Sequence, residues 1–154
     1  IDATEWVGPY DDEKLGFHKV AKLYYYPGWW EPGPSLSFYV NRRQWERLPE
    51  TYREVLRCAS RDAARAMQTR YDAKNPPALE RLLAAGVELR PFSREILDAA
   101  RRAAQGILEE NAARDAAFRH VYDRWKAFRD RSFRWFGTAE LAYAEFSFIR
   151  PEPR

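Results

Sequence analysis

Two glutamates, Glu5 and Glu31, are the residues of this sequence whose surroundings point most clearly to binding chemistry. Glu5 begins the run EWVGPYDD, and Glu31 lies in the run YYYPGWWEPGP. The chain around each of them, residues 1–10 and 23–41, contains no lysine or arginine. Because a carboxylate among aromatic groups is costly to ionise without a nearby positive charge, both glutamates need a cation from elsewhere. A bound metal ion is a natural candidate.

A pair of carboxylates flanked by tryptophans also suits glycoside hydrolysis. In that chemistry one carboxylic acid protonates the leaving group and the other acts as base or nucleophile. An enzyme using Glu5 and Glu31 in this way is therefore the alternative to a binding protein. A carbohydrate cleft needs more strands and more polar side chains around the carboxylates than this sequence offers. The two functions differ in whether the glutamates converge on one ion or flank an open groove.

Length and composition limit the other classes of function. The chain has 154 residues, enough for one ordinary domain with a core. Its 26 basic and 23 acidic residues give a net charge of +3 that is mixed along the chain, which argues against a nucleic-acid-binding surface. No run approaches the roughly 20 apolar residues of a membrane span. The single cysteine, Cys58, excludes an intrachain disulfide and lies in a helical pattern, where a catalytic role is not expected.

The first 41 residues read as strands that carry loops. Residues 1–7, 20–26 and 36–40 are each predicted to be extended, and Gly-Pro or Pro-Gly pairs follow the first two. Residues 11–17 are predicted to form a short helix, since acidic residues favour a first helical turn. Asn41 follows the third segment, where a turn role is expected.

From residue 43 onward the pattern is mainly helical. The apolar spacing of residues 52–67 indicates an amphipathic helix, which we expect the Asn-Pro-Pro sequence at 75–77 to break. A shorter helix ending at Gly86 and a strand at residues 87–90 follow. Ser93 is the expected N-cap of the next helix. The predicted buried stripe of that helix consists of Ile96, Leu97, Ala100, Ala104, Ile107 and Leu108.

The last helical segment carries a heptad-like apolar seam. Its members alternate in spacing by four and three: Val121, Trp125, Phe128, Ser132, Trp135, Ala139, Ala142 and Phe146. One small domain cannot cover so long a helix on several faces, which favours a spine between lobes or a dimer contact. Residues 151–154 are expected to be a frayed tail. The predicted fold class is α/β, rich in helices and with too few strands for a complete sheet.

These motifs resemble the C-terminal half of a TRAP-type (tripartite ATP-independent periplasmic) solute-binding protein of the dicarboxylate-binding (DctP) family, in the branch that binds 2-oxo acids or lactate. The resemblance covers nearly the whole chain. It rests on the two runs already quoted and on NPPAL, LRPF and WKAFR farther along. It implies a periplasmic-binding-protein-like fold in which two α/β lobes close over a small organic acid. Within that fold, residues 1–41 carry the ligand site, residues 42–112 form helices with a short strand, and residues 113–150 form a long helical spine.

The resemblance also implies the roles of individual residues. Glu5 and Glu31 supply side-chain oxygens to a metal ion, and Trp6 supplies its backbone carbonyl. The ion, Na⁺ or Ca²⁺, bridges to the carboxylate of pyruvate, another 2-oxo acid or lactate, since hard oxygen ligands suit both ions. The Trp6 ring and Trp30, with Trp29, wall the pocket and Glu31 lies against the substrate. No bond is made or broken, so the protein is a binding subunit and not an enzyme.

Members of that family are considerably longer than this chain. The N-terminal half, which would carry the export signal, an arginine for the substrate carboxylate and a further ion ligand, has no counterpart here. The resemblance implies a periplasmic protein that delivers its solute to TRAP permease subunits in the membrane. Some members of the branch dimerise through a long C-terminal helix, which offers a role for the apolar seam.

Plainer interpretations exist for several of these residues. Glu5 can be a solvent-exposed strand residue, and Trp29 and Trp30 can belong to a core. Asp11 and Asp12 suit a helix N-terminus better than a second metal site.

Overall fold

The computed structural model describes residues 2–31 and 33–148. The predicted frayed tail at 151–154 lies outside these residues. The chain divides into two compact units, Ile1–Ser93 and Arg94–Arg154. No described helix combines the length and the apolar character that crossing a membrane requires.

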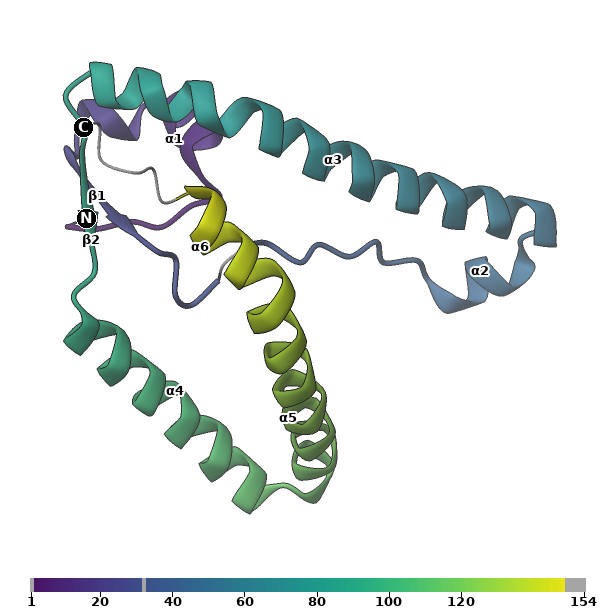
Figure 1. The fold of residues 1–154 in the computed structure, drawn as a ribbon. Helices are drawn as coiled ribbons and strands as arrows, with labels where there is room; N and C mark the ends of the chain where they lie inside the picture. The colour runs from purple at the N-terminus through teal and green to yellow at the C-terminus, as the bar shows by residue number, and fades with distance from the viewer. Residues whose placement is uncertain (1, 32, 149–154) are drawn as a thin grey trace. The chain divides into compact units, whose positions relative to one another are not determined.

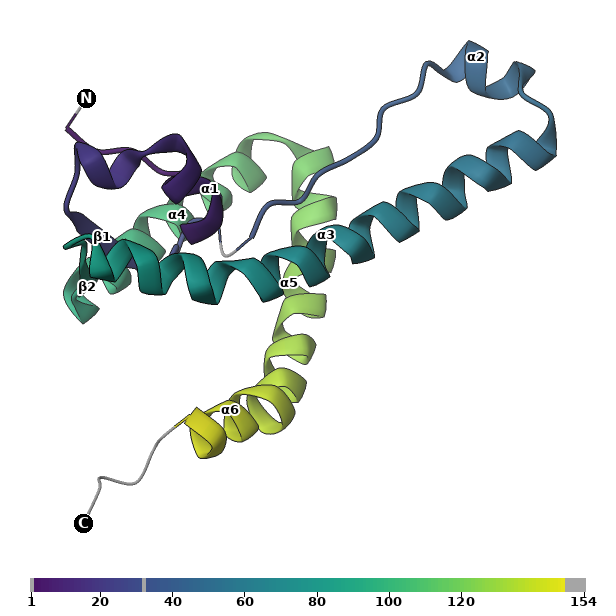
Figure 2. The same ribbon diagram turned by 90° about the horizontal axis from the view of Figure 1, so that it is seen from above.

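The first unit contains short elements followed by one long helix (Figures 1 and 2). In chain order these are α1 (Pro9–Leu15), the 3-10 turn η1 (Phe17–Lys19), β1 (Leu23–Tyr26), α2 (Arg42–Arg47), α3 (Glu50–Ala84) and β2 (Glu88–Pro91). The acidic residues Asp11 and Asp12 lie in the first turn of α1, as predicted. Asn41, expected in a turn, caps α2 by accepting a hydrogen bond from the Gln44 backbone N–H at 3.2 Å.

The two described strands, β1 and β2, pair in parallel. Leu23 is opposite Glu88, and Tyr26 is opposite Pro91. Both were predicted from the sequence, with boundaries that differ by a few residues. The predicted strand at 36–40 is wrong, since these residues form no ladder hydrogen bonds. The segment at 1–7, predicted to be a strand or extended chain, forms no strand over its described residues 2–7. A strand needs a neighbour for its backbone groups, and the described residues supply none beside these two segments.

The predicted helix break at residues 75–77 is also wrong. α3 continues through Pro76 and Pro77 as a helix of 35 residues. Each proline removes one backbone donor, yet this end of α3 is held by tertiary contacts, because α1 packs against it and the Asn75 side chain accepts a hydrogen bond from α1. The helix ends just before Gly86, whose φ of 83° permits the left-handed turn into β2.

The second unit is entirely helical where it is described. It consists of α4 (Arg94–Arg114), α5 (Ala116–Phe136), the π-helical turn η2 (Gly137–Leu141) and α6 (Ala142–Phe148). α4 begins directly after Ser93, as predicted, and the Asp115 carboxylate caps α5 through the backbone N–H groups of Ala117 and Phe118. α4 packs against α5, where Ala112 and Tyr122 are buried.

Few apolar side chains are buried in either unit. Those of the described core are Ala78, Leu82, Val87, Ala112 and Tyr122. The predicted buried stripe of α4 is therefore wrong in part, since Ile96 is 48% exposed and Ile107 is 59% exposed. The prediction of a helix-rich chain with few strands is confirmed, and large apolar faces remain uncovered within it.

Candidate functional site

The segment that carries Glu5 and Trp6 enters α1 through Gly8. Gly8 has a φ of 152°, a backbone conformation that residues with a side chain rarely adopt. Its carbonyl accepts hydrogen bonds from the backbone N–H groups of Asp11 and Asp12, at 3.1 and 3.0 Å, which fixes the first turn of α1. The direction of the segment that carries Glu5 and Trp6, relative to α1, therefore depends on the conformation of Gly8.

Polar contacts hold α1 against the C-terminal part of α3. The Tyr10 backbone N–H donates to Asn75 Oδ1 at 3.1 Å, and the Tyr71 hydroxyl donates to Asp11 Oδ2 at 2.5 Å. Arg81 donates from two nitrogens to the Glu13 carboxylate, at 2.6 and 2.7 Å. This bidentate pair keeps the pKa of Glu13 below its usual value. α1 is thus a docked element and not an independent helix.

The loop after β1 folds back tightly on itself. The Tyr26–Pro27 peptide bond is cis, and a Cβ added at Gly28 would lie 3.1 Å from the carbonyl oxygen of Glu31. Only a glycine allows the backbone at residue 28 to lie this close to the Glu31 carbonyl without movement of the loop. Gly28 therefore helps to fix the position of the Glu31 backbone. At Gly33, in contrast, an added Cβ meets no described atom within 4 Å.

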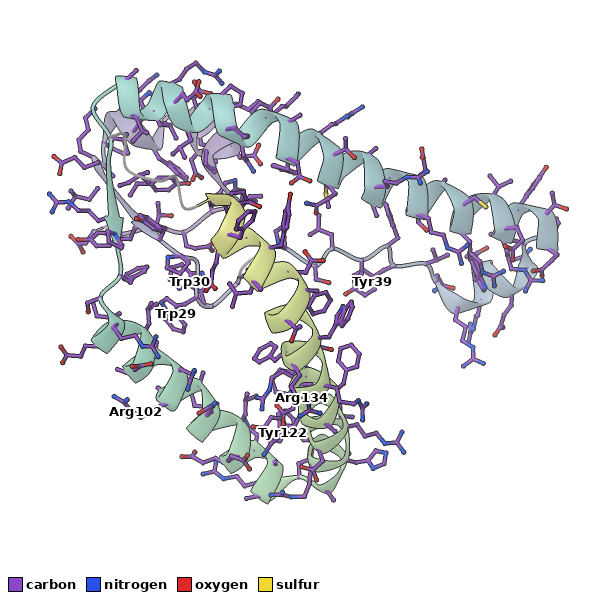
Figure 3. All side chains as sticks on the ribbon, viewed as in Figure 1. Trp29, Trp30, Tyr39, Arg102, Tyr122 and Arg134 are labelled. Carbon is purple, nitrogen blue, oxygen red and sulfur yellow. The ribbon has the colours of Figure 1, made fainter. Side chains whose placement is uncertain are left out.

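An aromatic cluster supports this loop from β2. The Trp29 and Trp30 rings lie edge to face, with centroids 5.2 Å apart, and Figure 3 shows the two side chains together. The ring centroids of Trp30 and Phe92 lie 6.1 Å apart, and the Phe92 ring stacks on that of Tyr25 with centroids 5.1 Å apart. The Phe92 backbone N–H also donates to the Tyr26 carbonyl at 2.8 Å. Phe92 therefore joins the end of β2 to both β1 and the tryptophan loop.

A second link joins the two candidate segments. The Tyr24 hydroxyl of β1 donates to Asp12 Oδ2 of α1 at 2.5 Å. Asp12 is 7% exposed, and among the described residues it is the one charged residue that is buried. Burial raises the pKa of Asp12, the hydrogen bond from Tyr24 opposes this, and the negative charges of Asp11 and Glu5 add to the increase. The charge of Glu5 therefore acts on the one buried residue of α1.

The predicted ligands themselves are open to solvent. Glu5 and Glu31 are both exposed, and neither forms an ion pair with a lysine or arginine anywhere in residues 2–31 and 33–148. Trp6 is 55% exposed, and Trp30 is 46% exposed, so neither belongs to a core in this chain. The described contacts bring Trp29 and Trp30 together but include no direct contact between Glu5 or Trp6 and Glu31. Pro32 of this loop lies outside the described residues.

The three predicted donor atoms suit a hard cation but are too few to complete its coordination. All three predicted ligands are oxygen atoms, which Na⁺ and Ca²⁺ prefer. The buried Oδ1 atom of Asp12 has no hydrogen-bond partner within the described structure, which adds to the uncompensated negative charge near Glu5. Over that part of the chain, no three His, Cys, Asp or Glu side chains group in a way that holds a metal. Since Ca²⁺ takes six to eight oxygen ligands, further donors must come from outside this set.

Three residues with clear structural roles at this site escaped the sequence reasoning. In the sequence, Phe92 and Tyr24 belong only to the quoted motifs, and Asp12 suits only a helix N-terminus. Their contacts join segments that are separated along the chain, so the sequence alone does not show that they meet. The aromatic content of 16% was the one available signal for such a cluster.

Comparison with known proteins places this chain in a family. Residues 1–115 match the model of the DctP family, described as bacterial extracellular solute-binding protein, family 7. A monocarboxylate 2-oxoacid-binding periplasmic protein of Nostoc sp. is 54% identical over 147 residues, which are 96% of this chain and 40% of that protein.

Three solved TRAP solute-binding proteins share the fold. That of Bordetella bronchiseptica, a dimer with calcium and picolinate in one site and the other site apo, is 42% identical with a TM-score of 0.92 over 96% of this chain and 44% of that one. That of Colwellia psychrerythraea, with calcium and pyruvate, is 33% identical with a TM-score of 0.88 over 94% and 44%. That of Pseudoalteromonas atlantica, with sodium and pyruvate, is 35% identical with a TM-score of 0.87 over 96% and 45%.

The chain spans less than half the length of these relatives. Its family match covers most of its own residues, and its helices and paired strands follow the solved TRAP proteins closely. The chain therefore belongs to the DctP family, family 7 of the bacterial extracellular solute-binding proteins.

Proposed function

We propose that this chain is the C-terminal part of the solute-binding subunit of a TRAP transporter. The subunit captures a small 2-oxo or 2-hydroxy carboxylate, such as pyruvate or lactate, together with Na⁺ or Ca²⁺. The observation that carries this proposal is the similarity, at 33–42% identity, to proteins solved with calcium or sodium and a small carboxylate. The family assignment also favours binding without turnover over the glycoside hydrolase alternative.

In this proposal the ion lies between the two exposed glutamates. Glu5 and Glu31 contribute side-chain oxygens, and Trp6 contributes its backbone carbonyl. The bound ion offsets the repulsion between these carboxylates and the carboxylate of the solute. The absence of an ion pair at either glutamate within the described residues supports this role, because it leaves both charges available.

The aromatic side chains form the wall of the pocket. Trp6 and Trp30 contact the solute and exclude water, while Phe92 and Tyr25 hold Trp30 in place through the ring contacts described above. A wall of this kind favours a short apolar side chain on the acid. The remaining donors for the ion and the solute, an arginine among them, come from the N-terminal half of the two-lobed protein.

The domain roles follow from the same proposal. Residues 1–41 carry the ligand site, residues 42–112 provide the helical framework with a short strand, and residues 113–150 form the spine. A leader in the N-terminal half exports the protein to the periplasm, where it delivers the solute to the membrane permease subunits.

The spine also provides a homodimer contact. Val121 and Phe128 of α5 are 66% and 64% exposed, and Phe146 of α6 is 83% exposed. Apolar faces this large are usually covered by a partner. The dimeric Bordetella protein supports this assignment.

Thermal unfolding and calorimetric titration of the full-length protein test the ion bridge. At a hundred times Kd, a bound acid stabilises the protein by about 2.7 kcal/mol. We expect pyruvate to raise the Tm, and we expect the increase to require Ca²⁺ or Na⁺. Chelator removes it if the ion is Ca²⁺, and replacement of Na⁺ by choline removes it if the ion is Na⁺.

The matched variants are Glu31→Gln and Glu46→Gln. Glu31→Gln removes one ligand charge, so we expect pyruvate affinity to decrease about hundredfold with little change in the Tm of the free protein. Glu46 is an exposed residue of α2 that pairs with Arg42, and its replacement should leave affinity unchanged. Equal affinity of Glu31→Gln and wild type would contradict the assignment of the ion bridge.

A further inference from the structure

The hydrogen bond between Tyr24 and Asp12 connects the two segments that carry the proposed ion ligands. α1 begins at Pro9, just after Glu5, Trp6 and Gly8, and β1 ends at Tyr26, just before the loop that leads to Glu31. Tyr24 donates from β1 to Asp12 Oδ2 of α1 at 2.5 Å. This is a short, direct polar link between the helix that orients one ligand segment and the strand that orients the other.

We propose that Asp12 and Tyr24 are positioning residues for the carboxylate and cation site, which set the separation of the Glu5–Trp6 segment from the Glu31 loop without touching the solute. This inference rests on the function proposed above.

The chemistry of Asp12 is poorly explained by stability alone. Burying a carboxylate is costly, and one hydrogen bond from a phenol offsets only part of the cost. The second oxygen, Oδ1, is buried with no hydrogen-bond partner in the described part of the chain. Negative charges at Asp11 and Glu5 oppose its ionisation further. An apolar residue would pack at this position of α1 at lower cost, so the hydrogen bond to Tyr24 explains why a side chain with an acceptor oxygen is found here.

The hydrogen bond between Tyr24 and Asp12 is also coupled electrostatically to cation binding. Glu5 acts electrostatically on Asp12 in the absence of an ion. A cation held by Glu5 weakens this repulsion, and the contact between Asp12 and Tyr24 then becomes more favourable. Ion binding and the fixed separation of the two segments therefore support each other.

The same helix provides a matched comparison. Tyr71 donates to Asp11 Oδ2 at 2.5 Å, so the two contacts use the same donor and acceptor groups at adjacent positions of α1. Tyr71, however, lies on α3, which carries none of the proposed ligands. Removal of either hydroxyl takes away one similar hydrogen bond, but only Tyr24→Phe disconnects two ligand segments.

The experiment measures pyruvate binding to the full-length protein in saturating Ca²⁺ and in saturating Na⁺, together with the Tm of the free protein. We expect Tyr24→Phe to weaken pyruvate binding about tenfold or more, in the range found when residues that orient metal ligands are replaced. We expect Tyr71→Phe to lower the Tm of the free protein by about as much as Tyr24→Phe does, because each removes one similar hydrogen bond. Its pyruvate affinity should stay within about twofold of wild type. Asp12→Asn keeps an acceptor oxygen for Tyr24 and should retain most of the affinity.

Equal affinities of Tyr24→Phe and Tyr71→Phe would overturn the positioning role while leaving the proposed function intact, provided that Glu31→Gln still weakens pyruvate binding about hundredfold. A Tyr24→Phe protein with lower Tm but wild-type affinity would overturn it in the same way. Failure of the wild-type protein to bind pyruvate or lactate with either ion would overturn the proposed function and this inference together.

Discussion

The proposed ligand-bearing end of the first unit and the helices of the second unit are each stabilised internally, and the kinds of contact differ between the two. Around α1 and β1, specific hydrogen bonds predominate, such as Tyr24 to Asp12 and Tyr71 to Asp11. In the second unit, α4 and α5 bury Ala112 and Tyr122 and leave Phe128 exposed. Directional polar contacts fix positions to a fraction of an ångström, whereas an uncovered apolar face contributes its free energy only when a partner covers it. This difference supports the proposed roles of the two units, a ligand site in the first and a dimer contact in the second.

The largest effect that tests this comparison is at the proposed dimer contact. Phe128→Asp places a charge on an exposed apolar face of α5, and we expect the dimer Kd to increase about hundredfold, equivalent to about 2.7 kcal/mol. Multi-angle light scattering over a concentration series of the full-length protein measures the change. Asp123→Arg, at an exposed position on the opposite face of the same helix, is the control and should leave the dimer in place. Unchanged association of the Phe128 variant would remove this face from the interface.

The aromatic cluster gives the next largest effect. Phe92→Ala removes the ring that contacts Tyr25 and Trp30, and we expect it to lower the free energy of unfolding by about 2 kcal/mol, less than a fully buried ring. Pyruvate affinity should decrease about tenfold, because Trp30 loses its support. Chemical denaturation and titration measure the two quantities.

Phe118 of α5 offers a matched control for Phe92. It is also half-buried, and its ring contacts Tyr122 at 6.0 Å. Phe118→Ala should lower the free energy of unfolding without a change in pyruvate affinity. If both phenylalanine variants weaken binding equally, the cluster around Trp30 has no special connection with the site.

A smaller effect is expected at the loop glycines. Gly28→Ala brings a Cβ to 3.1 Å from the Glu31 carbonyl oxygen, so the loop must shift by a few tenths of an ångström. We expect pyruvate affinity to decrease several-fold, about 1 kcal/mol or less. Gly33→Ala meets no described atom within 4 Å and should bind like wild type. If calorimetry finds the same pyruvate Kd for the two variants, the close approach of residue 28 to the Glu31 carbonyl oxygen has no effect on binding.

The smallest effects are the opposite pH dependences of two neighbouring acids. The pKa of Asp12 is raised above 3.8 by burial, so its contribution to stability is complete below that pH and is lost as the pH rises through its folded pKa. The pKa of Glu13 is lowered below 4.5 by Arg81, so its contribution is present above that pH and is lost as the pH falls through its folded pKa.

Urea denaturation of the ligand-free protein between pH 3 and pH 7 distinguishes the two. Relative to wild type, Asp12→Asn should become more stable as the pH rises, whereas Glu13→Gln should become less stable. Parallel curves for the two variants would contradict the opposite environments assigned to these adjacent residues.

The sequence was sufficient for the local features and for the family. The short strands at β1 and β2 and the acidic first turn of α1 follow from residue type and spacing. Contacts between distant segments could not be predicted in this way, which is why Phe92 and the link from Tyr24 to Asp12 were missed. The wrong predictions have the same origin. Prolines at 76 and 77 stay helical where α1 packs on α3, and residues 36–40 remain extended without a partner strand.

A crystal structure of the full-length protein with Ca²⁺ and pyruvate is the decisive test of the ion bridge. We expect one cation within about 2.3–2.6 Å of oxygens from Glu5 and Glu31 and of the Trp6 carbonyl oxygen, in contact with the pyruvate carboxylate. The Trp30 ring should lie against the bound acid. A cation or acid bound away from these residues, with Glu5 and Glu31 left in solvent, would contradict it.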